Sequence, residues 1–311
     1  MPCVVYGRSS NALGLAAGYA LDAVAGDPRR GHPVALFGRL AGAVERRVWA
    51  DSRSRGVAYA AACAGAATGL GVTVHKTTAR RPVARFAATA LATWIVLGGR
   101  GLAKEGVTMA HLLDADDLPA ARRRLSHLCG RDATDLGTKE LARAAIESIA
   151  ENTSDAVVAP LVWGAVAGIP GLLGYRALNT LDAMVGHRSP RHERFGWASA
   201  RADDVANLVP ARLGALAAVA CAPLAGGSPR RAWRVWRRDA HQHPSPNAGQ
   251  VEAAFAGALD VRLGGVNTYG TRVENRGTLG DGPAPGADDL RRSVRLSRVV
   301  GLAALAVAVA R

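Results

Sequence analysis

The chain has 311 residues, of which 49% are hydrophobic, and a formal net charge of +14 that comes almost entirely from arginine. Its four cysteines lie far apart with no CxxC pair, which argues against a zinc knuckle and a disulfide framework. The basic residues are spread between apolar runs and do not interleave with aromatic residues. This charge therefore favours anionic lipid or a phosphorylated substrate over nucleic acid.

Apolar runs predict membrane segments, and in chain order they lie near 11–26, 56–74, 82–99, 156–175, 206–226 and 296–310. Two of these runs reach the roughly 20 residues that a spanning helix needs, and the other four are shorter. Small residues dominate them, which lets membrane helices approach closely. The sequence thus predicts an all-α polytopic membrane protein with five to six membrane segments, long polar loops and one continuous domain over residues 1–311. A soluble, alanine-rich helical bundle is the alternative.

The distribution of Lys and Arg predicts the orientation of these segments. Loops 27–55, 100–150 and 227–295 carry most of the basic residues, so the positive-inside rule places them in the cytoplasm. Loop 176–202, which is rich in polar residues, then lies outside. The prolines and glycines of 156–175 also allow a re-entrant or broken helix in place of a full span, and the sequence leaves both open. The first segment does not resemble a removable signal peptide.

The first polar cluster follows the first apolar segment, at Gly26–Val34. Its turn presents one carboxylate (Asp27), two guanidinium groups (Arg29 and Arg30) and one imidazole (His32). Arginines beside free backbone N–H groups form an anion site. Attachment to lipid headgroups explains the same residues equally well.

The second cluster consists of carboxylates that precede the longest apolar run. On a helix, Glu147, Glu151 and Asp155 are spaced i, i+4 and i+8, so they share one face and repel one another. An arrangement that weakens the helix indicates a task such as holding a cation. Alternatively, Arg143 partly neutralises a solvated face.

Further polar clusters follow at 176–182, 191–204, 241–249 and 263–270. The Asp203–Asp204 pair precedes an apolar helix and either caps it, which is commoner, or binds magnesium. Asp182 lies one helical turn after Asn179, at a predicted membrane boundary. The loop from His241 to Gly249 lacks a third ligand at zinc spacing. The chain contains no Walker sequence, so a nucleotide would bind by another device.

Six segments together resemble those of the adenosylcobinamide-phosphate synthases, the CobD/CbiB membrane proteins of cobalamin biosynthesis. They are GDPRRGHPV, ESIAENTSDAVVAPLVWG, YRALNTLDAMVG, FGWASARADDVANLVPARL, HPSPNAG and LGGVNTYG, and the resemblance extends from about residue 11 to 310. It implies an inner-membrane enzyme that uses ATP and Mg²⁺ to join aminopropanol, as its O-phosphate or free, to a carboxylate of adenosylcobyric acid. It leaves open an association with other membrane enzymes of late cobalamin synthesis.

The resemblance also implies roles for individual residues. The candidate catalytic residues are Glu151, Asp155, Asp182, His32 and His243, with the two histidines as proton acceptors. The candidate magnesium ligands are Asp27, Glu151, Asp155, Asp182, Asp203 and Asp204. The candidate phosphate-binding arginines are Arg29, Arg30, Arg194 and Arg201, and the amides expected to contact the corrin ring are those of Asn152, Asn179, Asn247 and Asn267.

Two other classes of function compete with a ligase. A membrane transporter of a small anionic or corrinoid ligand could use the same carboxylates for coupling ions, but it should show repeat symmetry between its halves. A membrane sensor without catalytic activity would not need polar loop motifs this dense. Because the distinctive residues lie in loops, the enzyme is the favoured interpretation.

Overall fold

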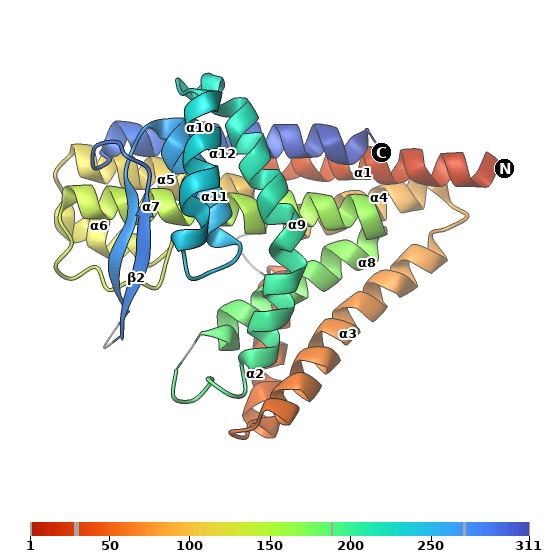
Figure 1. Ribbon diagram of the computed structural model, residues 1–311. Helices are drawn as coiled ribbons and strands as arrows, with labels where there is room; N and C mark the ends of the chain where they lie inside the picture. Colours follow the sequence, from red (N-terminus) through yellow and green to blue (C-terminus); the bar gives the residue numbers. More distant parts are fainter. Residues whose placement is uncertain (1, 28–30, 188, 270–271, 311) are drawn as a thin grey trace. The chain divides into compact units, whose positions relative to one another are not determined.

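The computed structural model describes residues 2–27, 31–187, 189–269 and 272–310, which form helices and one β-hairpin (Figure 1). The α-helices are α1 (Pro2–Ala25), α2 (Pro33–Val48), α3 (Arg53–Thr77), α4 (Pro82–Val96), α5 (Gly99–Asp114), α6 (Leu118–Leu125), α7 (Thr138–Thr153), α8 (Ala159–Leu181), α9 (Trp197–Cys221), α10 (Pro229–Asp239), α11 (Ala248–Leu259) and α12 (Ala287–Val309). The hairpin strands are β1 (Leu263–Tyr269) and β2 (Arg272–Leu279).

The chain folds into two compact units. Unit 1 comprises Met1–Gly98, Ala159–Asn207 and Leu305–Arg311, and unit 2 comprises Gly99–Val158 and Leu208–Ala304. Each unit is thus assembled from segments far apart in the sequence. Single-domain organisation stays a prediction.

Four helical stretches are long and apolar enough to cross a bilayer: Arg53–Thr77, Pro82–Asp114, Thr138–Gly186 and Trp197–Ala225. They contain the central four of the predicted segments, which confirms an α-helical, polytopic membrane protein. The first and last predicted segments are helical too, in α1 and α12, but they are not among these four stretches.

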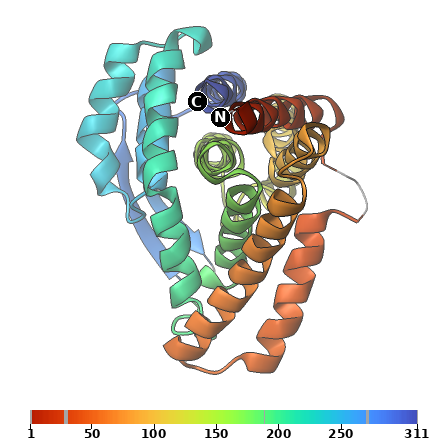
Figure 2. The ribbon, with the colours of Figure 1, turned by 90° about the vertical axis from the view of Figure 1, so that its right-hand side faces the viewer.

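Unit 1 is held together by close helix–helix contacts at small residues. Gly14 and Gly18 of α1 lie against Thr89 and Thr93 of α4, where any added side chain would collide. The α3 and α8 helices run side by side (orange and green in Figure 2). The small residues of the apolar runs therefore have the packing role that the sequence predicts.

The α8 helix is broken at Gly168, whose φ of 63° and ψ of −144° are not helical. Glycine adopts a positive φ readily, and Pro170 then occupies the first turn of the next helical segment, where its missing N–H costs little. Asn11 of α1 donates its side-chain N–H to the carbonyl of Gly164, 3.2 Å away, which compensates for the interrupted ladder. The sequence allowed a span or a broken helix over 156–175, and the structure shows the broken one.

Unit 2 places the hairpin beside α7 and α11, two of its most buried helices. The strands pair antiparallel from Leu263↔Leu279 to Tyr269↔Arg272, with a bulge between Gly264 and Val266. A two-stranded hairpin is marginal by itself and needs packing against other elements. Its polar contacts to these helices are therefore part of the site described next.

Candidate functional site

Unit 1 contains a charged cavity of about 850 Å³, a size typical of small-molecule sites. Three arginines, two carboxylates and one histidine line it together with small and apolar residues. The charged lining residues are Arg39, Arg46, Arg176, Asp27, Glu45 and His32. Two predicted site residues, Asp27 and His32, are thus brought together. Arg29 and Arg30, also predicted here, lie outside the described residues.

His32 caps the N-terminus of α2, and both of its ring nitrogens have a polar neighbour. Its Nδ1 accepts the backbone N–H of Val34 at 3.2 Å, and its Nε2 lies 3.6 Å from Oδ1 of Asp27. In the neutral ring the proton must therefore sit on Nε2, facing the Asp27 carboxylate. This geometry lets the neutral His32 ring donate a hydrogen bond through Nε2, and the predicted role as a proton acceptor stays a prediction.

Glu45 connects α2 to the turn that precedes α9. One of its oxygens accepts from Arg191 Nη2 at 2.9 Å and lies 3.3 Å from His192 Nε2. Partial burial alone would raise the pKa of Glu45, but the bonds from Arg191 and His192 outweigh it and hold the pKa below its ordinary value. The cavity wall thus keeps a fixed negative charge beside its arginines.

The predicted arginines Arg194 and Arg201 do not line the cavity. Arg194 pairs with Asp51 at 3.4 Å, and Arg201 pairs with Asp204 one turn along α9, also at 3.4 Å. Both guanidinium groups are more than half exposed, and such surface pairs contribute little stability. The cavity instead uses Arg39, Arg46 and Arg176, which the sequence reasoning missed.

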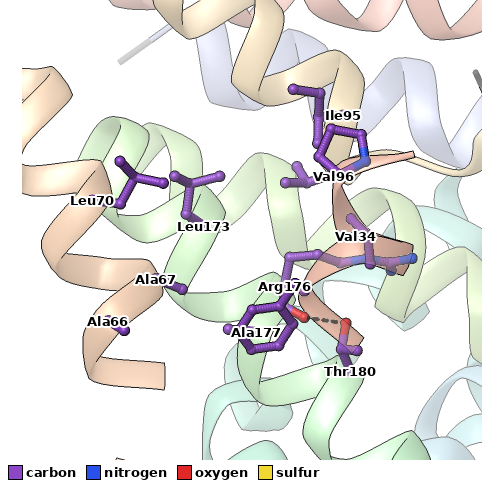
Figure 3. Close-up of a pocket in the computed structure, with 12 residues that line it drawn as sticks. Val34, Ala66, Ala67, Leu70, Ile95, Val96, Leu173, Arg176, Ala177 and Thr180 are labelled. Atoms are coloured by element: carbon purple, nitrogen blue, oxygen red, sulfur yellow. Dashed lines mark hydrogen bonds between the residues drawn. The ribbon is translucent and has the colours of Figure 1, made fainter. Parts of the chain in front are cut away.

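An apolar pocket of about 280 Å³ adjoins the charged cavity and shares Val34, Arg176 and Thr180 with it. Figure 3 shows the Arg176 side chain beside Val34, with the Thr180 hydroxyl bonded to the Arg176 carbonyl at 2.7 Å. The Leu70 and Leu173 side chains lie in its wall. A guanidinium at the boundary of an apolar pocket can bind the anionic end of a partly apolar ligand.

Behind Arg176, a chain of hydrogen bonds leads to the buried carboxylate of Asp203. Arg176 donates to the Asn179 amide oxygen at 3.3 Å, and the Asn179 amide donates to Asp203 at 3.4 Å. Asp203 also accepts from Asn207 at 3.0 Å, and Asn207 accepts from the Tyr175 hydroxyl at 2.9 Å. Asp203 and Asn179 therefore help to position a cavity residue, and their predicted roles in metal and substrate binding stay predictions.

Two of the predicted catalytic carboxylates, Asp155 and Asp182, lie in π-helical turns. These turns span Ser154–Val158 and Asp182–Gly186. Gly186 has no room for a side chain because the Asp182 carboxylate occupies the space where a Cβ would be. Since π-turns are rare and cluster at functional sites, both aspartates remain candidates on structural grounds.

Unit 2 contains a second polar cluster, which is buried. Glu147 accepts from Arg131 Nη2 at 2.5 Å and from the Gly264 N–H of β1 at 2.7 Å, and both side chains of the ion pair are almost fully buried. A buried pair of this kind requires complete hydrogen bonding, because each unpaired charge would be costly. Glu147 thereby ties α7 to the hairpin.

Glu252 on α11 is fully buried, with His243 Nε2 and Arg276 Nη1 each 3.7 Å from one of its oxygens. Burial, with repulsion from Glu147 and Glu151, raises the pKa of Glu252 well above its ordinary value. The sequence reasoning missed Glu252. The sequence feature that could have indicated it is that Glu252 is the one charged residue in the otherwise uncharged helix Ala248–Leu259.

His243 is neutral and oriented in the same cluster. Burial and the Arg276 charge lower its pKa to about 4, and its Nδ1 accepts the Ser245 N–H at 3.0 Å. Its proton therefore lies on Nε2, which faces Glu252. At neutral pH the Nε2–H can donate a hydrogen bond toward Glu252, and the predicted role of His243 as a proton acceptor stays a prediction.

Two further predicted residues of unit 2 bond to protein groups through their side-chain amides. Asn152 donates to the Ser148 carbonyl at 2.9 Å, and Asn267 accepts from Arg143 at 3.3 Å. Asn247 is held through its backbone N–H, which donates to the Ser245 hydroxyl at 3.3 Å, at the start of α11. Their predicted contacts with a corrin ring stay predictions.

Comparison with known families decides which family this architecture represents. The family model described as CobD/Cbib protein matches residues 15–297. The chain belongs to the CobD/CbiB family. Cobalamin biosynthesis protein CobD of Mycobacterium tuberculosis (strain H37Rv) is 56% identical over 301 residues, covering 96% of this chain and 95% of the relative. The proteins of the same name from Geobacter metallireducens and Rhodobacter capsulatus are 45% and 43% identical, covering 89% of this chain and 89% and 90% of each relative.

Membership of the CobD/CbiB family gives the chain a role in cobalamin biosynthesis. The resemblance found in its sequence motifs is thereby confirmed at the level of the family. No solved structure matches the chain.

The carboxylates predicted to bind magnesium are divided between the units of this CobD/CbiB protein. Asp27, Asp182, Asp203 and Asp204 belong to unit 1, and Glu151 and Asp155 belong to unit 2. Within the described ranges, no three His, Cys, Asp or Glu side chains gather as a metal cage. Magnesium commonly takes only one or two carboxylates, with waters and phosphate oxygens completing its shell. The cavity residues fit that mode, with Asp27 as the carboxylate.

Proposed function

We propose that this CobD/CbiB protein is an adenosylcobinamide-phosphate synthase. It would join the amine of aminopropanol O-phosphate, or of aminopropanol, to a carboxylate of adenosylcobyric acid in an ATP-dependent reaction. The observation that supports this best is the charged cavity of unit 1, with three arginines beside Asp27 and His32. A cavity of this charge suits a phosphorylated small molecule.

Amide formation from a free carboxylate is unfavourable in water, so the acid must first be activated, most simply as an acyl phosphate. Attack by the amine then releases inorganic phosphate and a proton. ATP would supply the phosphoryl group and leave as ADP, and Mg²⁺ would offset the charge of the phosphates. The protein's own task is to position the substrates and to offset the phosphate charge, which Arg39, Arg46 and Arg176 can do.

We assign Asp27 and His32 to hydrogen bonding and to proton acceptance at the cavity. The imidazole Nε2–H, oriented by the Val34 N–H and facing Asp27, can donate a hydrogen bond to a phosphate oxygen. Asp27, whose side chain is 43% exposed, is accessible either to magnesium or to the proton released by the amine.

The proposed setting is the cell's inner membrane, with loops 27–55, 100–150 and 227–295 facing the cytoplasm. Loop 176–202 would face the same side as 27–55, because its Arg191 bonds to Glu45 at 2.9 Å and its Arg194 pairs with Asp51 at 3.4 Å, which corrects the expectation that it lies outside. The corrinoid and the aminopropanol compound would reach the protein from that side. Other membrane enzymes of late cobalamin synthesis are proposed neighbours.

Reconstitution tests the proposal directly. Purified protein in detergent, given adenosylcobyric acid, aminopropanol phosphate, ATP and Mg²⁺, should yield the amide and inorganic phosphate. No product from active protein preparations, together with corrinoid uptake into liposomes, would overturn it in favour of transport.

A cavity variant tests the role of Arg176. Because a charge-assisted hydrogen bond is worth about 1.5–3 kcal/mol, Arg176→Gln should raise KM for the phosphorylated amine roughly tenfold to a hundredfold. Arg212→Gln is the matched control, since Arg212 is exposed and bonds to the Leu208 carbonyl of its own helix. An equal KM in both variants would remove Arg176 from the phosphate site.

A further inference from the structure

The α10 helix of unit 2 has two faces of opposite character. Its inner face, with Ala232 and Val235, is buried against α11, where Gly257 allows the close approach. Its outer face is a stripe of four exposed residues at i, i+3, i+4 and i+7, hereafter the outer stripe: Arg230, Trp233, Arg234 and Arg237. The apolar face is thus covered by protein, and the cationic and aromatic face is the one presented outward.

The arginines of α10 divide into paired and unpaired groups. Arg231 pairs with Asp260, and Arg238 bonds to Asp239 and Asp281. In the part of the chain that the structure describes, no carboxylate pairs with the three arginines of the outer stripe. The Arg237 guanidinium lies 5.9 Å from the ring centroid of Trp233, which is 47% exposed. Three positive charges around one exposed indole are therefore left for an external partner.

The position of α10 in the chain identifies that partner. The stretch Trp197–Ala225 is long and apolar enough to span a bilayer, and α10 begins at Pro229. Four residue steps cover at most about 14 Å, so α10 starts close to the end of this span. Residues at that depth meet lipid headgroups, and tryptophan is enriched there. Gly226, with a φ of 73°, and Gly227, which lies against Ala258, form the turn between them.

We propose that the outer stripe of α10 binds the phosphate groups of anionic phospholipid headgroups. Its arginines would contact lipid phosphates bidentately, and Trp233 would lie at the level of the headgroups. Because its apolar face packs on α11, the helix rests on the membrane surface and does not insert. The partner is thus a lipid surface of negative charge, and this site is separate from the cavity of unit 1.

Brominated lipids test the proposal with the full-length protein in nanodiscs. The contribution of Trp233 is the difference in emission between wild type and Trp233→Phe. Brominated phosphatidylglycerol should quench that contribution more strongly than brominated phosphatidylcholine at the same mole fraction. The preference should decrease at high salt, since surface charges are screened. Equal quenching by the two lipids, or none by either, would overturn the proposal.

Two variants that each remove one positive charge from α10 separate the effect of the outer stripe from that of net charge. Each basic residue near an anionic membrane contributes roughly a fivefold preference. Arg234→Gln should therefore reduce the phosphatidylglycerol preference severalfold, whereas Arg231→Gln, whose guanidinium pairs with Asp260, should leave it unchanged. Equal loss in both variants would refute a role for the stripe. Loss of the preference on adding inorganic phosphate at constant ionic strength would assign the site to free phosphate instead.

Discussion

The buried ion pair between Arg131 and Glu147 gives the sharpest test of how unit 2 is stabilised. The relative exposures of these side chains are 3% and 2%, so neither charge can be compensated by water. Arg131→Met would leave the Gly264 N–H as the one remaining hydrogen-bond donor to the Glu147 carboxylate among the residues that the structure describes. Removing one partner of a buried pair costs about 3–5 kcal/mol.

This cost should appear as a lower unfolding temperature. A change of 1 kcal/mol moves the midpoint by roughly 2–4 °C in a domain of about 150–250 residues, the size range of unit 2, so Arg131→Met should lower the midpoint of unit 2 by roughly 6–20 °C. The double variant Arg131→Met/Glu147→Gln should recover most of the loss. Glutamine is uncharged and can still accept the Gly264 N–H. Tryptophan fluorescence during heating of detergent-solubilised protein measures all three midpoints.

Arg124→Met provides the matched control in the same unit. Arg124 also bonds to a carboxylate, that of Glu105, but both side chains are about a quarter exposed. The expected loss is about 1 kcal/mol or less. If Arg131→Met and Arg124→Met lowered the midpoint equally, or if the double variant showed no recovery, burial of the Arg131–Glu147 charge pair would not be the cause.

Two further predictions concern packing and pH. Gly56→Ala should destabilise unit 1, because the new Cβ would collide with the Phe195 carbonyl. Gly65→Ala on the same helix is the control: its Cβ has no neighbouring atom, so this variant should be neutral or slightly stabilising. The thermal unfolding midpoints of the two variants test this difference. Glu252→Gln should be more stable than wild type at pH 7–8 and equal to it near pH 4.5. The raised pKa makes unfolding release a proton, so wild-type stability falls as pH rises above 4.5. A constant difference across this pH range would show that Glu252 does not titrate on unfolding.

The membrane helices could be predicted from the sequence because their signal is local. A long uncharged run such as 57–75 has few alternatives to a buried or lipid-facing helix. The break at Gly168 was foreseen as an option, since glycines and prolines concentrate there, but its position depends on Asn11 of α1 reaching the Gly164 carbonyl. Such a contact joins residues 153 positions apart and leaves no local trace.

The candidate site was predicted less completely, because motif membership does not show which way a side chain points. Arg194 and Arg201 lie in distinctive segments, yet they form surface pairs with Asp51 and Asp204. Arg39 and Arg46 look like ordinary charges on an amphipathic helix, yet they line the cavity. Surface arginines can be told from cavity arginines only once the tertiary arrangement of α2, α8 and the turn before α9 is known.

Polar contacts to buried side chains hold the hairpin in place in unit 2. It is attached through the Gly264 N–H to Glu147, through Asn267 to Arg143, and through Arg276 to Glu252. Hydrophobic packing is non-directional and would tolerate a shift of the strands, whereas bonds to buried carboxylates fix their register. The Arg131 variant should therefore disturb the hairpin together with α7, because Glu147 is bonded to both Arg131 and β1.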